Sequence, residues 1–360
     1  MAVSVEQEVY LKAYIGRGQS PREDHFGIRQ ICDIGVELEN GDILVRTLFL
    51  GMSPSLRFSL NEDSATTCSA GRISEGQVLA SDGIGVVQAS RSSVFQVGDL
   101  ISNRPKLLAW PWRSMVRFQE RDLIGACDRW NDSHFVCHQP EVVVDGLGIS
   151  GMTAYFGISD YLHPGPNSVL VVSAASGAVG SIAGQIGKRL GFTRVVGVTS
   201  SSQKAEFIRQ LGFDEAVVYN SGASAEWQND LRSACGGGID GYFDNVGGDV
   251  SLAVAELLNE GATCAICGAM SQTAHGGNDQ AWVELARRRG AAVQWFRYTS
   301  YMDDEDGRIT HARAQLQQWM DEGALKIVRT YFDGLASASS CFVRLFSASK
   351  LGKALVRVST

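Results

Sequence analysis

Residues 169–190 constrain the fold more than any other part of the chain. The run Val-Leu-Val-Val at 169–172 is too short for a buried helix and is typical of a strand covered on both faces. A turn of small residues follows at 173–180, and apolar side chains then recur at helical spacing, namely Val179, Ile182, Ala183, Ile186 and Leu190. Strand, glycine turn and helix in this order predict the first half of a nucleotide-binding βαβ unit.

The turn has the residue types that a pyrophosphate site needs. Gly177 lets the backbone come close to a phosphate, and Gly180 lets the helix pack tightly on the strand. The N–H groups at the start of the helix form an anion site, which falls at Ser176, Gly177, Ala178 and Val179. Similar turns also occur in α/β proteins that bind no cofactor, so the prediction depends on the second strand.

That second strand, at 194–198, ends about 20 residues after the turn, where an acid that binds the ribose is expected in NAD-dependent proteins. No Asp or Glu stands there, and the chain reads Thr199-Ser200-Ser201-Ser202-Gln203-Lys204. A carboxylate would bind a free ribose hydroxyl and repel a phosphate, whereas hydroxyls and a cation suit a 2′-phosphate. Thr199, Ser200 and Lys204 therefore predict NADP(H) rather than NAD(H).

The composition limits the class of protein. At 360 residues the chain is long for one domain and sufficient for two, each with its own core. The net charge of −7, with no basic patch, argues against nucleic acid as a partner. Because no apolar run reaches membrane-spanning length and no signal peptide is recognisable, we expect no membrane association and a cytoplasmic location.

The eight cysteines are scattered, as in proteins with reduced and mostly buried thiols. Cys264 and Cys267 alone have a C-x-x-C spacing, within an apolar run that predicts a buried strand. Since the sequence has no second cysteine pair to complete a zinc site, we expect no metal.

The regions that flank the βαβ unit differ from each other. Apolar runs punctuated by glycine, at 42–50, 75–80, 83–89 and 95–101, predict a small β-barrel. Trp110 and Trp112 flank a proline and form either the wall of a pocket or part of the core. The later part of the chain predicts α/β structure, with helices beginning near 148 and at 205–210 and 309–320, and strands within 211–219 and 238–248. The end of the chain, 350–358, returns to strand character and suggests that it completes the first domain.

Together these residues resemble the zinc-independent branch of the medium-chain dehydrogenase/reductases, in particular the prostaglandin reductase and alkenal double-bond reductase group. The resemblance extends over nearly the whole chain. It rests on Val45-Arg46-Thr47-Leu48, Asn61-Glu62-Asp63, Trp110-Pro111-Trp112, residues 148–155, the glycine turn, residues 242–249, Cys267-Gly268 and Gly352-Lys353. The run Tyr-Phe-Asp-Asn-Val-Gly-Gly at 242–248 is particularly specific to this group, and the residues after it are most similar to the 15-oxoprostaglandin 13-reductase type.

The resemblance implies an α/β protein of two domains. One is a GroES-like β-barrel at 1–130, completed by 320–360, and the other is a Rossmann domain with a doubly wound parallel sheet at 131–319, which binds NADP(H). Lys204 matches the position that faces the 2′-phosphate, Tyr219 a position near the adenosine, and Asn245 a turn beside the cofactor; Cys267 follows on the next strand. The implied substrate is a small unsaturated ketone or aldehyde, and the implied assembly is a monomer or homodimer.

The implied reaction is reduction of a C=C bond conjugated to a carbonyl. Hydride goes to the β-carbon, the enolate that develops is stabilised by hydrogen bonds, and a proton is delivered at the α-carbon. Two alternatives stay open: a quinone reductase of the same superfamily, and an NADPH-binding protein in which catalysis is impaired.

Three positions depart from the pattern of the group. Thr273 replaces a tyrosine that assists at the substrate carbonyl, Ser55 replaces a tyrosine that follows a proline, and Lys350 replaces an asparagine that faces the cofactor. We therefore expect a roomier substrate pocket lined by Ser55, Arg57 and Trp110. Another tyrosine could serve at the carbonyl, namely Tyr301 or Tyr298, and His275 is a further candidate acid; all three are also compatible with a surface loop.

Overall fold

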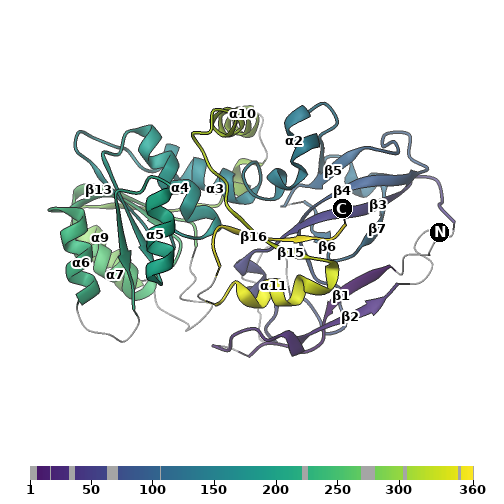
Figure 1. Ribbon diagram of the computed structural model, residues 1–360, viewed down its shortest axis with the longest axis horizontal. Coiled ribbons are helices and arrows are strands. Elements are labelled where there is room, and N and C mark those ends of the chain that lie inside the picture. The colour runs from purple at the N-terminus through teal and green to yellow at the C-terminus, as the bar shows by residue number, and fades with distance from the viewer. Residues whose placement is uncertain are drawn as a thin grey trace. The chain divides into compact units, whose positions relative to one another are not determined.

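The computed structural model of the protein describes residues 6–16, 18–31, 37–62, 72–105, 107–220, 226–268, 280–302, 306–347 and 350–359. The chain forms two compact units, whose elements are labelled in Figure 1. The first unit comprises Met1–Asp145, Thr330–Lys350 and Ala354–Thr360, and the second comprises Gly146–Arg329 and Leu351–Lys353. The ranges 1–130 with 320–360 for the substrate, and 131–319 for NADP(H), stay predictions about what each part binds.

The first unit is built on an eight-stranded sheet. Its main path runs β15-β16-β3-β4-β5-β8, while β6 pairs with β4 and β7 pairs with β3. These strands are β3 (Asp42–Gly51), β4 (Ala80–Ser90), β5 (Leu100–Asn103), β6 (Trp110–Pro111), β7 (Met115–Gln119), β8 (Cys127–Arg129), β15 (Arg329–Asp333) and β16 (Lys353–Arg357). A separate antiparallel pair joins β1 (Gln7–Leu11) to β2 (Phe26–Gln30).

Short helices connect these strands. They are η1 (Glu23–His25), η2 (Pro54–Ser59), α1 (Glu120–Leu123), α2 (His134–His138), η3 (Pro140–Val144), η5 (Leu335–Ser337) and α11 (Ala338–Arg344). The strand expected at the end of the chain is present as β16 and pairs antiparallel with β3, so the C-terminal segment does complete the first unit. The strand expected at 75–80 is largely absent: Gly76 has a positive φ of 82° in a turn, Val78 forms only an isolated bridge with Tyr10, and Ala80 is the first residue of β4.

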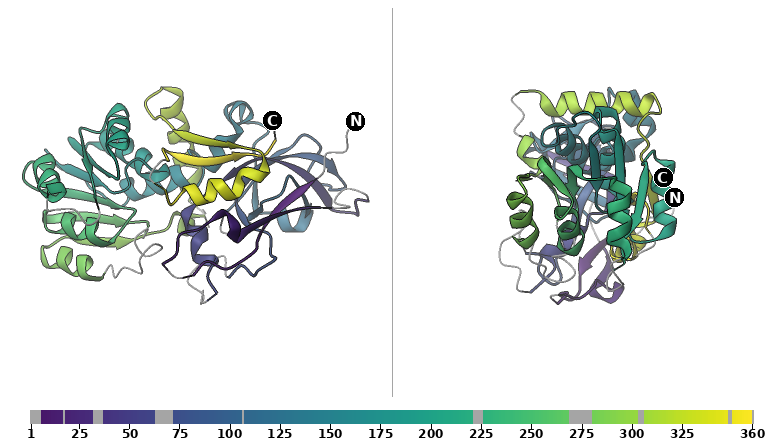
Figure 2. Two further views of the ribbon diagram at one scale, coloured as in Figure 1. Left: turned by 60° about the horizontal axis from the view of Figure 1, so that its bottom comes forward. Right: turned by 90° about the vertical axis from the view of Figure 1, so that its left-hand side faces the viewer.

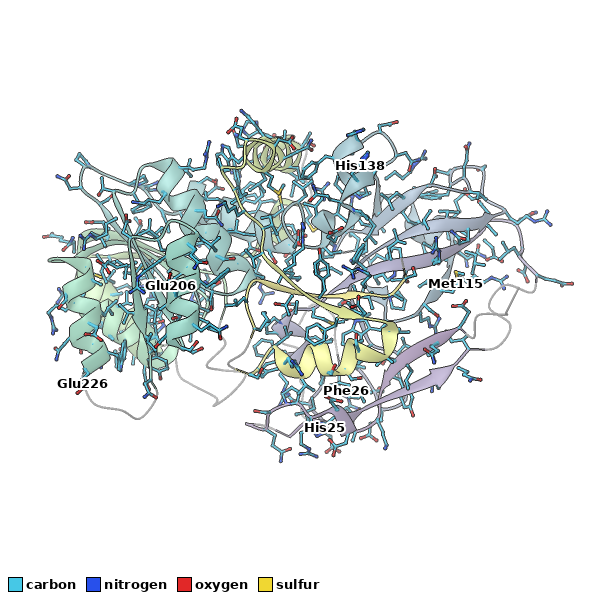
Figure 3. All side chains as sticks on the ribbon, in the orientation of Figure 1. His25, Phe26, Met115, His138, Glu206 and Glu226 are labelled. Carbon is cyan, nitrogen blue, oxygen red and sulfur yellow. The ribbon has the colours of Figure 1, made fainter. Side chains whose placement is uncertain are left out.

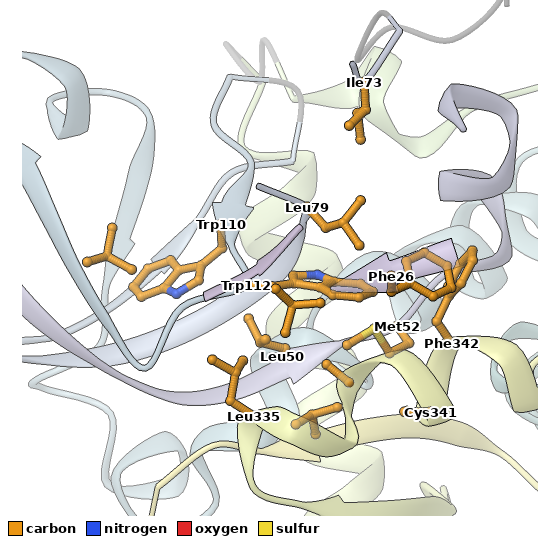
Figure 4. Packing of buried hydrophobic residues seen from close by; sticks show 14 of the residues in the cluster. Phe26, Leu50, Met52, Ile73, Leu79, Trp110, Trp112, Leu335, Cys341 and Phe342 are labelled. Carbon is orange, nitrogen blue, oxygen red and sulfur yellow. The ribbon is translucent and has the colours of Figure 1, made fainter. Parts of the chain in front are cut away.

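The core of the first unit joins segments that are far apart in sequence. Figure 4 shows Trp110 and Trp112 among buried side chains that come from both the beginning and the end of the chain, such as Phe26 and Phe342. Neither tryptophan has any exposed surface, and each indole N–H is satisfied, Trp110 Nε1 by Thr47 Oγ1 at 3.0 Å. Gly83 leaves room for the Trp110 ring, since a Cβ there would stand 2.3 Å from the ring.

The second unit is a six-stranded parallel sheet with the order β11-β10-β9-β12-β13-β14. Its strands are β9 (Val169–Val172), β10 (Arg194–Thr199), β11 (Glu215–Val218), β12 (Ile239–Asp244), β13 (Leu258–Ile266) and β14 (Ala292–Trp295). The strand order reverses between β9 and β12, which is the doubly wound Rossmann arrangement with its switch point there. The predicted α/β class and Rossmann sheet are confirmed.

Helices cover both faces of this sheet (Figure 2). The helices of the second unit are α3 (Ile149–Ser159), α4 (Ala178–Leu190), α5 (Ser202–Gln210), α6 (Glu226–Cys235), α7 (Gly248–Ala255), α9 (Gln280–Arg288), η4 (Tyr298–Tyr301) and α10 (Arg308–Asp321). On one face, α6, α7 and α9 share a core with the strands, around Trp227, Val254 and Trp282. Within the described ranges, no helix is long and apolar enough to cross a membrane.

Candidate cofactor-binding site

The predicted cofactor residues lie at one edge of the second unit's sheet. Parallel strands end at a common edge, and Thr199 closes β10, Tyr219 follows β11, Asn245 follows β12, and Cys267 follows β13. The glycine turn follows β9, next to the switch point between β9 and β12. Ligands of open α/β sheets bind in the crevice outside the carboxyl ends of the strands at such a point.

The glycine turn begins α4 without a side-chain cap. Gly177 is the N-cap residue, and its N–H donates to the Ala174 carbonyl at 2.9 Å. The first turn of α4 contains no acidic residue, so its N–H groups, which lack intrahelical acceptors, are compatible with an anion. A Cβ on Gly180 would stand 2.5 Å from the Ala174 carbonyl oxygen, which explains why only glycine fits there. Ala174 itself has a φ of 47°, an uncommon conformation for a residue with a side chain.

A segment from the end of the chain holds this turn in place. The Gly352 N–H donates to the Ser176 carbonyl at 2.8 Å, and Gly352 forms a parallel bridge with Gly177. Gly352 needs to be glycine, because its φ is 63° and a Cβ would stand 2.0 Å from the Val328 carbonyl oxygen. Lys350, half-buried, lies two residues earlier in the chain. The sequence motif Gly352-Lys353 pointed to this segment, but its contact with the turn came only from the structure.

Lys204 lies in the first turn of α5, beside the end of β10. Its Nζ donates to Ser200 Oγ at 3.0 Å, and partial burial lowers the pKa of its ammonium group. Among the described residues no carboxylate pairs with it; Glu206, labelled on the same helix in Figure 3, accepts a hydrogen bond from Gln210. A half-buried cation whose partner is a hydroxyl fits a phosphate group, as the sequence predicts for a 2′-phosphate.

Tyr219 stands close to the end of β10. Its N–H donates to the Thr199 carbonyl at 2.8 Å, and its ring packs edge-on against Trp227 at 5.0 Å between centroids. The half-buried phenol has its pKa raised by desolvation, so it is neutral near pH 7. Such a ring offers a flat apolar surface beside the hydroxyls of 199–200, as expected for a residue near an adenosine.

Asn245 and Cys267 meet at the ends of β12 and β13. The Cys267 thiol donates to Asn245 Oδ1 at 3.1 Å, while Asn245 Nδ2 donates to the Ser173 carbonyl at 2.7 Å. Burial raises the pKa of the Cys267 thiol, so it is a neutral donor and not a thiolate nucleophile. Asn245 thus spans the switch point, from the end of β9 to the end of β13.

Asp244 is a buried residue of this edge that the sequence analysis missed. Its Oδ1 accepts hydrogen bonds from Ser173 and Tyr242 and from two N–H groups of the following turn. Burial raises the pKa of this carboxyl group. A carboxylate at the end of a largely buried strand, directly before Asn245, was the signal that could have identified it.

The described residues of this edge fit a dinucleotide with a 2′-phosphate. A Cβ on Gly177 would stand 3.2 Å from the Ala174 carbonyl oxygen, which favours glycine at this position, and the N–H groups at the start of α4 are compatible with an anion. Lys204 supplies the cation about one strand away, at the end of β10. Ser176, Gly177, Ala178, Val179, Thr199, Ser200, Lys204, Tyr219, Asn245 and Cys267 are thereby brought to one edge, and their contacts with the cofactor stay predictions.

Tyr301 is engaged within the second unit. Its hydroxyl donates to Asp160 Oδ2 at 2.8 Å and lies 2.9 Å from the Tyr161 hydroxyl, and its ring stacks on Phe156 at 4.0 Å. Burial and these two neighbours raise the pKa of Tyr301, so it stays protonated. Tyr298 is buried at 5% exposure, so the alternative of a surface loop was wrong for it. Thr273 and His275 lie outside the described residues.

The residues predicted for the substrate pocket lie in the first unit, and two of them are buried inside it. The Arg57 guanidinium is 2% exposed and donates to Asn61 and to the carbonyls of Gly16 and Gln19, at 2.7 and 3.0 Å. Burial lowers its pKa. Trp110 is a core residue, as described above, so within this unit it lines no open surface.

Ser55 alone of these three is exposed. Its hydroxyl lies 2.8 Å from that of Ser53 at the start of η2. Arg57 is bonded to the carbonyls of Gly16 and Gln19, and Trp110 belongs to the core. The substrate pocket at Ser55, Arg57 and Trp110 stays a prediction.

Comparison with known proteins identifies the family. Residues 19–122 match the family described as the N-terminal domain of oxidoreductase, and residues 178–303 match the family described as zinc-binding dehydrogenase. The Bacillus subtilis protein YfmJ, whose name describes an NADP-dependent oxidoreductase, is 32% identical over 337 residues, which are 90% of each chain. Prostaglandin reductase 1 of Mus musculus is 30% identical over 329 residues, 89% of this chain and 90% of the relative.

The chain belongs to the medium-chain dehydrogenase/reductase superfamily. Within it, the chain falls in the zinc-independent prostaglandin reductase group of NADP-dependent oxidoreductases, which confirms the resemblance drawn from the sequence. Solved structures agree: CurA from Vibrio vulnificus has a TM-score of 0.83 at 28% identity over 99% of both chains. The same protein in complex with NADPH has a TM-score of 0.84 at 27% identity over 98% of this chain and 99% of that one.

Membership of the superfamily explains the two units. The first is the GroES-like domain and the second is the Rossmann-like domain with its six-stranded parallel sheet. Although one matching family is described as zinc-binding, the described part of this reductase contains no group of three or more His, Cys, Asp or Glu side chains that could hold a metal ion.

Proposed function

We propose that this protein uses NADPH to reduce the C=C bond of α,β-unsaturated ketones or aldehydes. The observation that carries the proposal is the arrangement of Lys204 at the end of β10. This half-buried cation has the Ser200 hydroxyl as its partner, which suits the 2′-phosphate of NADPH. It is joined by the family relationship, since relatives aligned over about nine-tenths of the chain are named prostaglandin reductase 1.

Bound NADPH supplies the hydride. The protein's own task is to hold the cofactor in one orientation. The start of α4 would bind the pyrophosphate, and Lys204 would bind the 2′-phosphate. It must also donate a hydrogen bond to the substrate oxygen, where negative charge develops. No nucleophile is needed, which agrees with the raised pKa of the Cys267 thiol at this edge.

Two hydroxyls are candidates for the donor to the substrate oxygen. Thr273 occupies the position of the group's tyrosine, with a shorter reach. Tyr301 keeps its proton, because its pKa is raised, but its hydroxyl is bonded to Asp160 and would have to exchange that partner for a substrate. We favour Thr273 for this reason and keep Tyr301 as the alternative.

The proposal is tested by following NADPH oxidation with a panel of enones, enals and quinones, with NADH as the control. Turnover of enones with a strong preference for NADPH is expected. Turnover of quinones alone would identify a quinone reductase, and tight NADPH binding without turnover of any compound would identify a protein that has lost catalysis.

The choice of donor is tested with Tyr301→Phe, using Tyr161→Phe as the matched control because its hydroxyl is the neighbour of Tyr301. If Thr273 is the donor, both variants keep kcat within about threefold of the native enzyme. A loss of about 100-fold in kcat for Tyr301→Phe alone, the usual scale for one removed donor to a developing oxyanion, would assign the role to Tyr301.

A further inference from the structure

Asp244 is the most deeply buried charged group at the cofactor edge. It closes β12 and has no exposed surface. Its Oδ1 accepts four hydrogen bonds: from Ser173 Oγ at 2.9 Å, from the Tyr242 hydroxyl at 2.8 Å, and from the N–H groups of Val246 and Gly247 at 2.9 and 3.0 Å. One carboxylate oxygen therefore organises the whole turn that follows β12.

These bonds join the two strands that flank the switch point. Ser173 follows β9, and its Oγ both donates to Asp244 and accepts the Asn245 N–H at 2.8 Å. The Asn245 side chain then donates to the Ser173 carbonyl at 2.7 Å. Ser173 directly precedes Ala174, whose positive φ and carbonyl set the position of Gly177. A chain of hydrogen bonds thus runs from Asp244 to the glycine turn.

Stability alone does not account for a carboxyl group at this place. Burial of a carboxylate without a cation is costly, and the described partners of Asp244 are hydroxyl and N–H groups only. Its second oxygen, Oδ2, is buried without any hydrogen-bond partner in the described part of the chain. An arrangement with these costs is expected where a site must be held in one geometry.

We propose that Asp244 is a positioning residue for NADPH. Through Ser173 and the turn at 245–247 it holds the ends of β9 and β12 in the arrangement that the cofactor needs, before the cofactor binds. This inference rests on the NADPH-binding part of the proposed function and is independent of the substrate. Asp244 itself touches neither the cofactor nor the reacting atoms in this role.

The test measures the Kd for NADPH by fluorescence titration, without any substrate, alongside the midpoint of urea unfolding. Asp244→Ala removes all four bonds, and Ser173→Ala removes both the bond to Asp244 and the acceptor for the Asn245 N–H. Each variant is expected to raise the Kd about tenfold or more. Since both remove the bond between Ser173 and Asp244, the rise in Kd for the double variant should be smaller than the product of the two single rises. Asp244→Asn keeps an acceptor at Oδ1 and should restore the Kd to within about threefold of the native value.

Ser251→Ala is the matched control. Ser251 is as fully buried as Asp244, and its Oγ lies 2.7 Å from the Tyr242 hydroxyl, but among the described residues it makes no hydrogen bond to the turn at 245–247. It should lower the unfolding midpoint and leave the Kd unchanged. The proposal would be overturned if, in all three variants (Asp244→Ala, Ser173→Ala and Ser251→Ala), the Kd for NADPH rose in proportion to the fall in the unfolding midpoint. A network that only stabilises the fold would give this result.

The result stays decisive if Asp244→Ala does not fold. Ser173→Ala then has to weaken NADPH binding about tenfold while Ser251→Ala does not, and equal Kd values for the two would refute the positioning role. A failure of the proposed function has a different signature: no enone is turned over, although NADPH binds and responds to these variants.

Discussion

The two units treat their buried carboxylates in opposite ways. In the first unit Glu8, 5% exposed, lies between Arg29 and Arg113, with N–O distances of 2.6 and 2.5 Å. Asp42, also buried, pairs with Arg117. Asp244 of the second unit has hydroxyl and N–H partners instead of a cation. Carboxylates neutralised by arginine serve to join strands, whereas the uncompensated one lies at the edge where we place the cofactor.

A similar contrast holds for one cationic side chain of each unit, Arg57 and Lys204. Arg57 in the first unit donates to the carbonyls of Gly16 and Gln19, which are distant in sequence, while Lys204 in the second unit has a single hydroxyl partner and a lowered pKa. The buried charges of the first unit are paired within it, whereas Lys204 at the sheet edge of the second unit has no carboxylate partner among the described residues.

Trp110→Ala is expected to lower the free energy of unfolding by about 3–5 kcal/mol, because it removes a fully buried ring and leaves Thr47 Oγ1 without its donor. The Kd for NADPH should not change, since the ring belongs to the core of the first unit. Urea unfolding and NADPH titration measure the two quantities. If the milder Trp110→Phe raised the KM of an enone tenfold, Trp110 would be part of the substrate pocket and not only of the core.

Lys204→Ala should weaken NADPH binding by about 1.5–3 kcal/mol, the value of a hydrogen bond to a charged group, and leave NADH binding unchanged. Lys188→Ala is the control in the same unit, because Lys188 Nζ is already paired with Asp214 at 2.6 Å. It should change neither affinity. Equal losses for NADPH and NADH in Lys204→Ala would remove Lys204 from contact with the 2′-phosphate.

The pH dependence of stability should have opposite signs for Asp42 and Asp244. Arg117 lowers the pKa of Asp42 below 3.8, so the stability it contributes is present above pH 3.8 and is lost as the pH falls through its lowered pKa. Burial raises the pKa of Asp244 above 3.8, so its contribution is full below pH 3.8 and is lost as the pH rises through the raised pKa.

Urea unfolding of the native protein, Asp42→Asn and Asp244→Asn at several pH values measures this difference. Asp244→Asn should gain stability relative to the native protein as the pH rises, and Asp42→Asn should lose it. A parallel response of the two variants would mean that the units do not differ in the way their carboxylates are compensated.

Ala174→Gly should have the smallest effect. The left-handed conformation of Ala174 costs about 1–2 kcal/mol relative to glycine, and the added chain entropy of glycine offsets about 0.5–1 kcal/mol of this. A net gain in unfolding free energy of up to about 1 kcal/mol is expected. A loss instead would mean that the methyl group of Ala174 makes packing contacts that outweigh the backbone strain.

Much of the second unit could be predicted because its signals are local. The run at 169–172, the turn with Gly177 and Gly180, and the helical spacing up to Leu190 correspond to β9, the turn and α4. In a doubly wound sheet each strand is followed by its helix, so periodicity and turn residues are enough to order the elements. The edge strand β14 was missed, because its four residues give no clear alternation.

The first unit was predicted less well because its contacts are not local. Residues 75–80 have the apolar character of a strand, yet the backbone turns at Gly76, where φ is 82°. On sequence alone Trp110 could belong to either a pocket or the core, and Arg57 was expected in the pocket. Their burial depends on segments far away in the chain, such as Thr47 for Trp110 and the loop of Gly16 for Arg57.

The α/β class, the nucleotide-binding unit and the preference for a phosphorylated dinucleotide could be predicted from the sequence, since each depends on neighbours within a few tens of residues. The contacts that hold the edge of the sheet together became visible only in the folded protein. Ser173 and Asp244 are bonded across the switch point, and Gly352 is bonded to Ser176 from near the end of the chain. Parallel strands bring such residues together through crossover connections, so sequence spacing carries no record of these contacts.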